Sequence, residues 1–175
     1  MTIKSGNLIA AITGGAFYSG YVTYEAVDYV LDTPASILAT WIVGVELMSA
    51  PSAGDDWPLF ISYLPDGINV DDNIGAIYNT TPVKDARNMN TGRVIQHYGI
   101  EIMIRALSEE SGWDKCNNIS GNLDTLFNQA ITKDDNTYTI HSISRVGGIN
   151  SLGYEENTKR RRMFSMNFIV SITTV

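Results

Sequence analysis

Cysteine and histidine are almost missing from this sequence of 175 residues, which contains one cysteine and two histidines. Zinc sites are built from several of these side chains, so we expect no metal site. The single cysteine, Cys116, has no disulfide partner in the chain, and we interpret it as a small core residue. A reducing cytoplasm suits this composition.

Positive charge is scarce as well. The chain has 12 lysines and arginines against 19 aspartates and glutamates, which gives a net charge of −7. This excess of acidic residues argues against sequence-independent DNA binding, because such binding depends on neutralising phosphates.

Long apolar runs are missing, since no segment reaches the ~20 uninterrupted apolar residues of a membrane helix. The apolar run at 8–16 loosely resembles a signal peptide. Thr13, Gly14 and Gly15 interrupt it, however, and no clear A-x-A cleavage site follows. We therefore expect a soluble, unprocessed protein that does not bind membranes.

Nucleotide-binding and hydrolase motifs do not occur. The stretch GGAFYSG at 14–20 lacks the glycine spacing and the lysine of a phosphate-binding loop, and there is no G-x-S-x-G sequence. We therefore expect no cofactor. Adjacent acidic residues fall in predicted loops or helix starts, where solvation and the helix dipole account for them. These pairs are Asp55-Asp56, Asp71-Asp72, Glu109-Glu110, Asp134-Asp135 and Glu155-Glu156.

The composition of 44% hydrophobic and 18% charged residues is typical of a single globular domain. Residues 1–31 differ from the rest because glycine, alanine and tyrosine stand among β-branched residues there. This pattern favours short strands or an arm that lies on another surface, such as a neighbouring subunit. We therefore divide the chain into an N-terminal arm, 1–31, and a domain, 32–175.

The stretch Arg93–Leu107, RVIQHYGIEIMIRAL, gives the strongest structural signal. Successive side chains of a strand point to opposite faces. The even positions form an almost wholly apolar face, whereas the odd positions place His97, Glu101 and Arg105 in a polar row. The pattern predicts a long central strand with one face on the core and the other partly in water.

A helix is predicted directly after this strand. From Ser108 to Ala130, apolar residues recur at steps of three and four and form one stripe that can lie on the even face of the strand. The stripe consists of Trp113, Cys116, Ile119, Leu123, Leu126, Phe127 and Ala130. We expect its two aromatic residues to be buried against the strand at Tyr98, Ile100 and Ile102.

The remaining segments complete an α+β pattern. Asp32-Thr33-Pro34 predicts the start of a first helix, which ends before Pro51. Residues 80–93 are interpreted as a long polar loop, and Gly147-Gly148 as a break. Strands are predicted at 57–64, 74–79, 137–146, 152–154 and 163–172. We therefore expect a largely antiparallel sheet of about four to five strands with two helices packed on one face.

Two polar groups have competing interpretations. His97, Glu101 and Arg105 form either an acid–base set or a cross-strand polar ladder on the wet face. The basic run Lys159-Arg160-Arg161-Arg162 is either an exposed hairpin end or a contact with an acidic partner subunit or with DNA. Because adjacent cations repel one another, acidic groups or phosphates are expected nearby. Our preferred source is a neighbouring copy of the chain.

Several stretches together resemble one known family. They are the early helix, WPLFISYLPD (57–66), IGAIYNT (74–80), NMNTGRVIQHYGIEIMIRAL (88–107) and LGYEENTKRRRMFSMNF (152–168). Over residues 33–173 the chain resembles the tail-terminator proteins of long-tailed bacteriophages, also called tail-completion or minor capsid proteins. The resemblance is a spread pattern without a catalytic signature, and residues 1–31 lie outside it.

The resemblance implies a non-enzymatic structural protein of the virion, placed in the tail near the neck. Its copies would form a sixfold ring that caps the tail tube, ends polymerisation of the tail-tube protein and joins the head-side connector protein. DNA would pass through the bore without sequence-specific binding. Candidates for contact with a neighbouring subunit or the bore are Lys84, Arg87, Arg93, Glu101, Arg105, Arg145, Lys159, Arg160, Arg161 and Arg162.

Two alternatives remain open at this point. One is another neck or tail-tube protein, which would share the structural character of the family. The other belongs to a different class and is a small enzyme that uses His97, Glu101 and Arg105. Loss of activity in a His97→Ala variant with an unchanged oligomeric state would identify the enzyme.

Overall fold

The computed structural model describes residues 32–51, 56–66, 71–87, 94–155 and 160–174, with the backbone alone for 82–87 and 94–96. Within these ranges the chain forms two helices and one six-stranded sheet. The helices are α1 (Pro34–Gly44) and α2 (Glu109–Leu123). The strands are β1 (Leu59–Ile61), β2 (Ile74–Arg87), β3 (Val94–Ala106), β4 (Phe127–Lys133), β5 (Asn136–Tyr154) and β6 (Arg162–Thr174).

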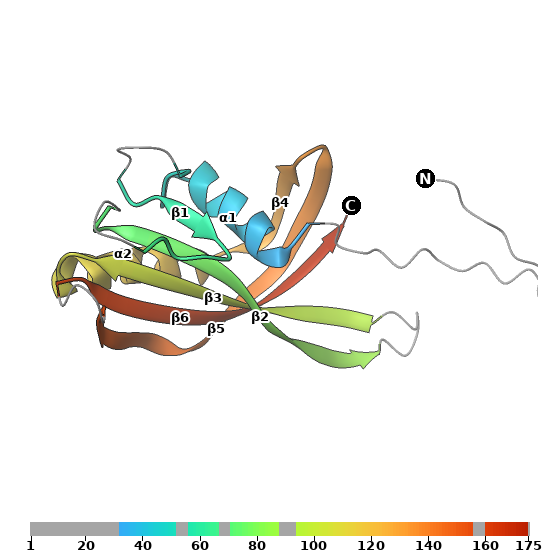
Figure 1. Ribbon diagram of the computed structural model, residues 1–175. Coiled ribbons are helices and arrows are strands. Elements are labelled where there is room, and N and C mark those ends of the chain that lie inside the picture. Colours follow the sequence, from blue (N-terminus) through green and yellow to red (C-terminus); the bar gives the residue numbers. More distant parts are fainter. Residues whose placement is uncertain (1–31, 52–55, 67–70, 88–93, 156–159, 175) are drawn as a thin grey trace, which may run out of the picture.

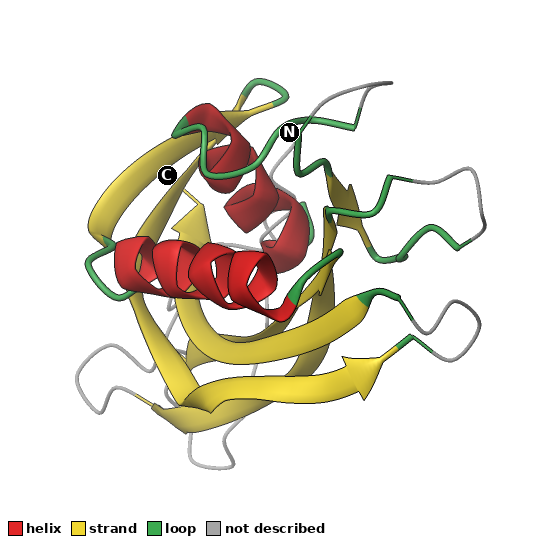
Figure 2. Cartoon of the chain, turned by 90° about the vertical axis from the view of Figure 1, so that its left-hand side faces the viewer, coloured by secondary structure: helices red, strands yellow, loops and turns green. Residues whose placement is uncertain are grey.

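The sheet has the strand order β1-β2-β3-β6-β5-β4. β1 runs parallel to β2, whereas every other neighbouring pair is antiparallel. Both helices lie on one side of the curled sheet (Figures 1 and 2). The predicted α+β class is confirmed, with slightly more strands than expected.

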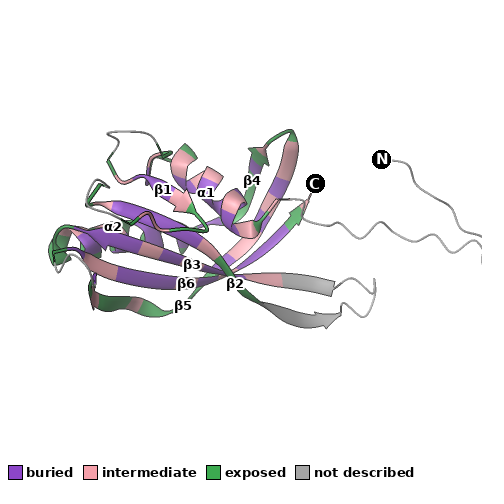
Figure 3. Cartoon of the chain, viewed as in Figure 1, coloured by how far each residue is buried: buried purple, intermediate pink, exposed green. Residues whose placement is uncertain are grey.

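β3 is the long central strand that the alternating pattern predicts. Its even residues Ile100, Ile102 and Ile104 are fully buried. They belong to one core cluster with Ile37 of α1 and Cys116 of α2, so both helices pack on this face. Figure 3 shows the buried centre of the sheet along β3 and β6.

The start of α1 agrees with the sequence prediction. The hydroxyl of Thr33 accepts a hydrogen bond from the backbone N–H of Ser36 at 3.3 Å, and Pro34 occupies the first turn, where its missing N–H has no helical partner to lose. The helix ends at Gly44, which is earlier than expected. Glu46 has a φ of 59°, and a residue in this left-handed region cannot continue the helix.

α2 is shorter than predicted, because the residues after Leu123 turn into β4 instead of adding helical turns. The expected burial of the two aromatic residues is wrong: Phe127 is 71% exposed and Trp113 is 44% exposed. As a strand, β4 gains the backbone ladder with β5 and buries Ile131, which lies opposite Tyr138. The backbone ladder and the burial of Ile131 favour the strand over a longer helix, because the apolar stripe of the predicted helix does not include Ile131.

The polar loop expected at 80–93 is wrong in its first half, where β2 continues to Arg87. β2 and β3 pair as far as Arg87↔Val94, whereas β6 leaves β3 after His97↔Ser171. Beyond that point, residues 83–87 and 94–96 form a two-stranded extension, here called the distal ribbon, that leaves the body of the sheet (Figure 1). Residues 80–87, TTPVKDAR, are mostly polar and show no alternating apolar pattern, so their sequence does not indicate a strand.

The predicted break at Gly147-Gly148 is also wrong, since β5 runs without interruption from Asn136 to Tyr154. Gly147 has a φ of 80° and Gly153 a φ of 87°, and the pairing with β6 shifts register close to both glycines. The glycines therefore accommodate irregular pairing inside one long strand.

Candidate functional site

His97, Glu101 and Arg105 share one face of β3, but they do not come together. Positions four residues apart in a strand are separated by ~13 Å, which is beyond hydrogen-bond reach. His97 lies opposite Ser171 at the point where β6 leaves β3. Glu101 lies between Tyr78 of β2 and Asn167 of β6, and burial together with this carboxylate raises the pKa of Tyr78.

Arg105 is the buried centre of an ion cluster, so its expected place on a wet face is wrong. Its side chain is 0% exposed, and Nη1 lies 2.9 Å from Oε1 of Glu155. Nη1 also donates to the carbonyl of Pro65 at 2.7 Å, and Nη2 donates to the carbonyl of Asp71 at 3.0 Å. Burial lowers the pKa of Arg105, while Glu155 opposes this effect. A residue committed to these internal contacts is not available to a subunit or to the bore.

Arg161 joins the same cluster from the segment that precedes β6. Its Nε donates to Oδ1 of Asp72 at 2.6 Å, and its Nη1 lies 3.4 Å from Oε2 of Glu155. The backbone N–H of Glu155 donates to the carbonyl of Arg161 at 2.9 Å. Two arginines therefore face two carboxylates, and together they fasten the segment around Asp71 to β3 and to the β5–β6 end.

Arg162 is also paired within its own chain. Its guanidinium lies 3.1 Å from Oε2 of Glu109 and 3.9 Å from the ring centre of Tyr154. The expectation that a neighbouring copy or DNA supplies the acidic groups is therefore wrong for Arg161 and Arg162. Arg160 is exposed, and Lys159 lies outside the described residues.

The other basic candidates belong to different parts of the chain. Arg145 lies 3.3 Å from Oδ2 of Asp124, at the end of α2. Lys84 and Arg87 belong to β2 in the distal ribbon, where the backbone alone is described. Arg93 lies outside the described residues. The described basic candidates thus do not form a single patch.

A second polar cluster fixes the beginning of the domain, and the sequence analysis missed it. The hydroxyl of Tyr138 donates to Oδ2 of Asp32 at 2.5 Å, and Nζ of Lys133 lies 2.8 Å from Oδ1 of Asp32. The hydrogen bond from Lys133, followed by that from Tyr138, lowers the pKa of Asp32. Asp32 is thereby held at the β4–β5 hairpin, more than a hundred residues away in the sequence.

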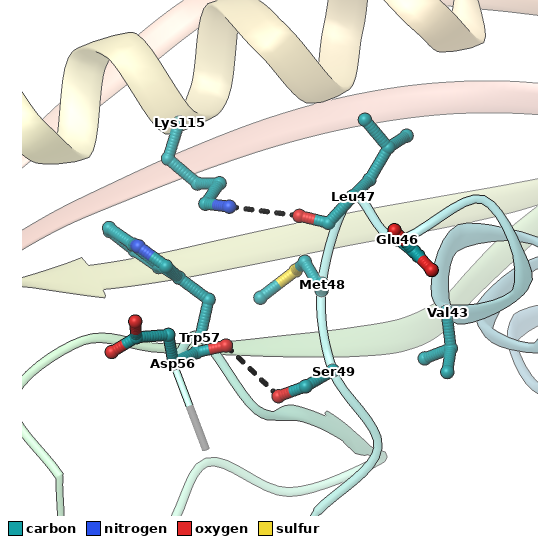
Figure 4. A pocket seen from close by; sticks show the side chains of 8 residues that line it. All are labelled: Val43, Glu46, Leu47, Met48, Ser49, Asp56, Trp57 and Lys115. Atoms are coloured by element: carbon teal, nitrogen blue, oxygen red, sulfur yellow. Dashed lines mark hydrogen bonds between the residues drawn. The ribbon is translucent and has the colours of Figure 1, made fainter.

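Two hollows of about 310 Å³ and 520 Å³ share Trp57 and Lys115 in their linings. Figure 4 shows the first of them, in which Nζ of Lys115 donates to the carbonyl of Leu47 at 2.9 Å. The same amine lies 5.0 Å from the ring centre of Trp57, and burial lowers its pKa. Lys115 thereby fastens α2 to the residues after α1, which gives this side chain a structural role.

Besides the outer edges of β1, of β2 beyond Ile77 and of β5 beyond Ser142, two further stretches of sheet edge lack a partner strand in the described ranges. One belongs to the distal ribbon, where β3 pairs with β2 alone. The other is the outer edge of β4, which is last in the strand order. Figure 3 shows exposed residues along β4, where four consecutive residues from Phe127 to Ala130 are exposed.

Comparison of the chain with protein-family models gave no match. Comparison with curated proteins also gave no match. In the part of the chain that the structure describes, no helix is both long and apolar enough to cross a membrane. The same residues contain no group of three or more His, Cys, Asp or Glu placed to hold a metal ion.

Proposed function

We propose that this chain is a structural subunit of a phage virion whose copies form a ring. The ring caps the tail tube, ends its polymerisation and joins it to the head-side connector. The distal ribbon is the observation that carries this proposal. An isolated two-stranded hairpin is at best marginally stable in water, so a ribbon that leaves the body of the sheet gains from a second surface to lie on.

The resemblance to tail-terminator proteins supplies the class of assembly. Of the stretches that carry it, IGAIYNT (74–80) lies in β2 just before the distal ribbon, and NMNTGRVIQHYGIEIMIRAL (88–107) includes its β3 residues 94–96. A ring requires a head-to-tail contact between two different surfaces of the same chain. The ribbon supplies one surface that is separate from the rest of the body.

The polar residues of β3 support a structural role over catalysis. A catalytic set needs groups within hydrogen-bond reach of one another or of one reacting atom. His97, Glu101 and Arg105 are instead spaced along the strand, and Arg105 is committed to Glu155 and to two backbone carbonyls. In the described structure, these three residues therefore lie at separate points along β3.

Shortening the distal ribbon tests the proposal. Lys84 and Gln96 are paired, so replacing residues 85–95 by Asn-Gly closes the hairpin with a two-residue turn. The variant is expected to unfold in urea like the parent protein, but to fail to assemble and to leave tail tubes overlong. Native mass spectrometry with purified tail tubes, together with tube lengths from electron micrographs, gives both readouts.

The β4–β5 hairpin offers a matched control, because Asp134-Asp135 forms its two-residue turn. Placing Asn-Gly there introduces the same residues without touching the ribbon, and assembly should be unchanged. Tails of normal length that join heads in the presence of the shortened variant would contradict the ribbon assignment. If a particle image places the labelled chain elsewhere in the neck or tube, the chain is another neck or tail-tube protein and not a tail terminator.

A further inference from the structure

The outer edge of β4 presents backbone groups that no described strand pairs. Lys133 and Asn136 close the two-residue turn of the β4–β5 hairpin, and the pair that closes such a turn exchanges hydrogen bonds. Hydrogen-bonded pairs alternate along the ladder, so Ile131 and Gln129 also bond to β5. Ala130 and Thr132 therefore direct their N–H and C=O groups away from the sheet.

The side chain of Gln129 supports this orientation. Its Nε2 donates to the carbonyl of Ala130 at 3.1 Å, so a donor outside the β5 ladder reaches this carbonyl. Ala130 and Thr132 are both exposed. Natural sheets usually blunt such an edge with proline, inward-pointing charge or a covering segment. β4 contains no proline, and its sequence, FNQAITK, carries charge only at its last residue.

Residues 17–31, FYSGYVTYEAVDYVL, are the part of the chain best suited to form another strand. Tyrosine, valine, phenylalanine and threonine dominate this stretch, and it contains no proline, lysine or arginine. Its end is fixed, because the next residue, Asp32, is held by Lys133 and Tyr138. Fully extended, these residues span about 50 Å, which is enough to reach the next molecule in a ring.

The position of Asp32 excludes antiparallel pairing of the residues just before it with β4 of the same chain. Within one chain, antiparallel pairing would place Leu31 beside Phe127, about 20 Å along β4 from Lys133. Asp32 lies at the Lys133 end, with Lys133 Nζ 2.8 Å from its carboxylate, so a single connecting residue cannot span that distance. On a neighbouring copy the same residues can pair antiparallel, which is the more stable arrangement.

We infer that residues 17–31 of one copy add an antiparallel strand to the β4 edge of the next copy. The contact is mediated by the backbone and joins two different surfaces, as a closed ring requires. The inference rests on the proposed ring and names one of its junctions. It gives the N-terminal arm a role that the resemblance does not cover.

Hydrogen exchange on the full chain tests the junction directly. On assembly, the amides of Ala130 and Thr132 should exchange at least about tenfold more slowly. The amides of Gln129 and Ile131 are the internal control, because they are bonded to β5 in either state. Slow exchange of Ala130 and Thr132 in dilute monomer would place the strand in the same chain and overturn the inference.

Complementary full-length variants test which surfaces meet. Ala130→Pro removes the outward N–H and blocks the edge, while Ala130→Val keeps this N–H and is its control. Val22→Pro with Val27→Pro breaks the arm, and Ala10→Pro is the control outside it. Neither blocked variant should assemble alone. An equimolar mixture should form a one-to-one pair without rings, since only one intact arm and one open edge are present.

The outcomes separate the two proposals. If the parent protein forms rings that end tail tubes and Ala130→Pro does so equally well, the junction is wrong and the proposed function stands. If the parent protein neither assembles nor changes tube length, both proposals fail. Pairing of the two blocked variants, observed by native mass spectrometry, is the result expected from the junction.

Discussion

Replacing Glu155 by glutamine is expected to lower the free energy of unfolding by ~3–5 kcal/mol. The Glu155 carboxylate lies 2.9 Å from Arg105 and 3.4 Å from Arg161, and the Arg105 side chain is 0% exposed. A neutral amide in its place removes the carboxylate that Arg105 and Arg161 share; Arg161 keeps Asp72, whereas the fully buried Arg105 keeps only the weaker attraction of Asp66. The cost comes from this uncompensated buried charge and not from the loss of a favourable pair.

Two neighbouring ion pairs with exposed carboxylates show how little stability the loss of an exposed pair should cost. Asp72, which pairs with Arg161, has a side chain that is 47% exposed, and Glu109, which pairs with Arg162, is 62% exposed. Pairs of this exposure contribute less than about 1 kcal/mol. Asp72→Asn and Glu109→Gln should therefore change stability little. Urea is the suitable denaturant, because it carries no charge that would screen the cluster.

A double-mutant cycle separates the charge effect from packing. Arg105→Met also loses the hydrogen bonds to the carbonyls of Pro65 and Asp71, so it should destabilise on its own. Combined with Glu155→Gln, it removes the uncompensated charge. The double variant should therefore lose at least about 1 kcal/mol less free energy of unfolding than the two single variants lose in sum. The reasoning would be refuted if the losses of free energy of unfolding were additive. It would also be refuted if Glu155→Gln destabilised the protein as little as Glu109→Gln.

Two further predictions concern titration and thiol reactivity. Asp32→Asn should reduce stability above pH ~4, where the lowered pKa keeps Asp32 ionised beside Lys133 and Tyr138. The difference from the parent protein should vanish in urea melts as the pH falls through that lowered pKa, and a difference that persists there would contradict the assignment. Burial raises the pKa of Cys116 to about 12, so it should resist a thiol reagent at pH 8 until the protein unfolds. Rapid labelling of the native protein would show that the core opens at α2.

The elements that could be predicted from the sequence are those with local signals. β3 shows a period of two because its even residues from Ile100 to Ala106 are buried on one face. Thr33 and Pro34 mark the start of α1 because capping involves neighbours only a few residues away. Cys116 lies in the core, as its place on the apolar stripe indicates.

The polar clusters could not be predicted, because their members are brought together by the fold. Glu155 meets Arg105 across 50 positions, and Asp32 meets Tyr138 across 106. A sequence shows that charges are present but not which of them become neighbours. Adjacent acidic residues at 155–156 suggested a solvated loop, whereas Glu155 is buried between two arginines.

The elements outside the core were missed for another reason. The β2 half of the distal ribbon, 83–87, has the sequence VKDAR, which shows no alternating apolar pattern. Gly147 looks like a break because glycine usually ends a strand, yet its positive φ accommodates a register shift in β5. In both cases the strand is defined by backbone pairing, and pairing leaves little trace in side-chain composition.

Phe127 fits both a helical and a strand pattern in the sequence. Two substitutions test which of the two describes this segment in the folded protein. A helix extending to Ala130 would bury Phe127 on the core, and Phe127→Ala would then cost ~3–5 kcal/mol. With Phe127 71% exposed in β4, the same change should stay within about 0.5 kcal/mol. Phe168 of β6 is the matched control, since it is 1% exposed and Phe168→Ala removes the same atoms from the core. Urea melts should therefore separate the two alanine variants by at least about 2 kcal/mol. Equal losses for both would mean that Phe127 packs inside, and that the stripe of helical spacing, not the β4 ladder, describes this segment.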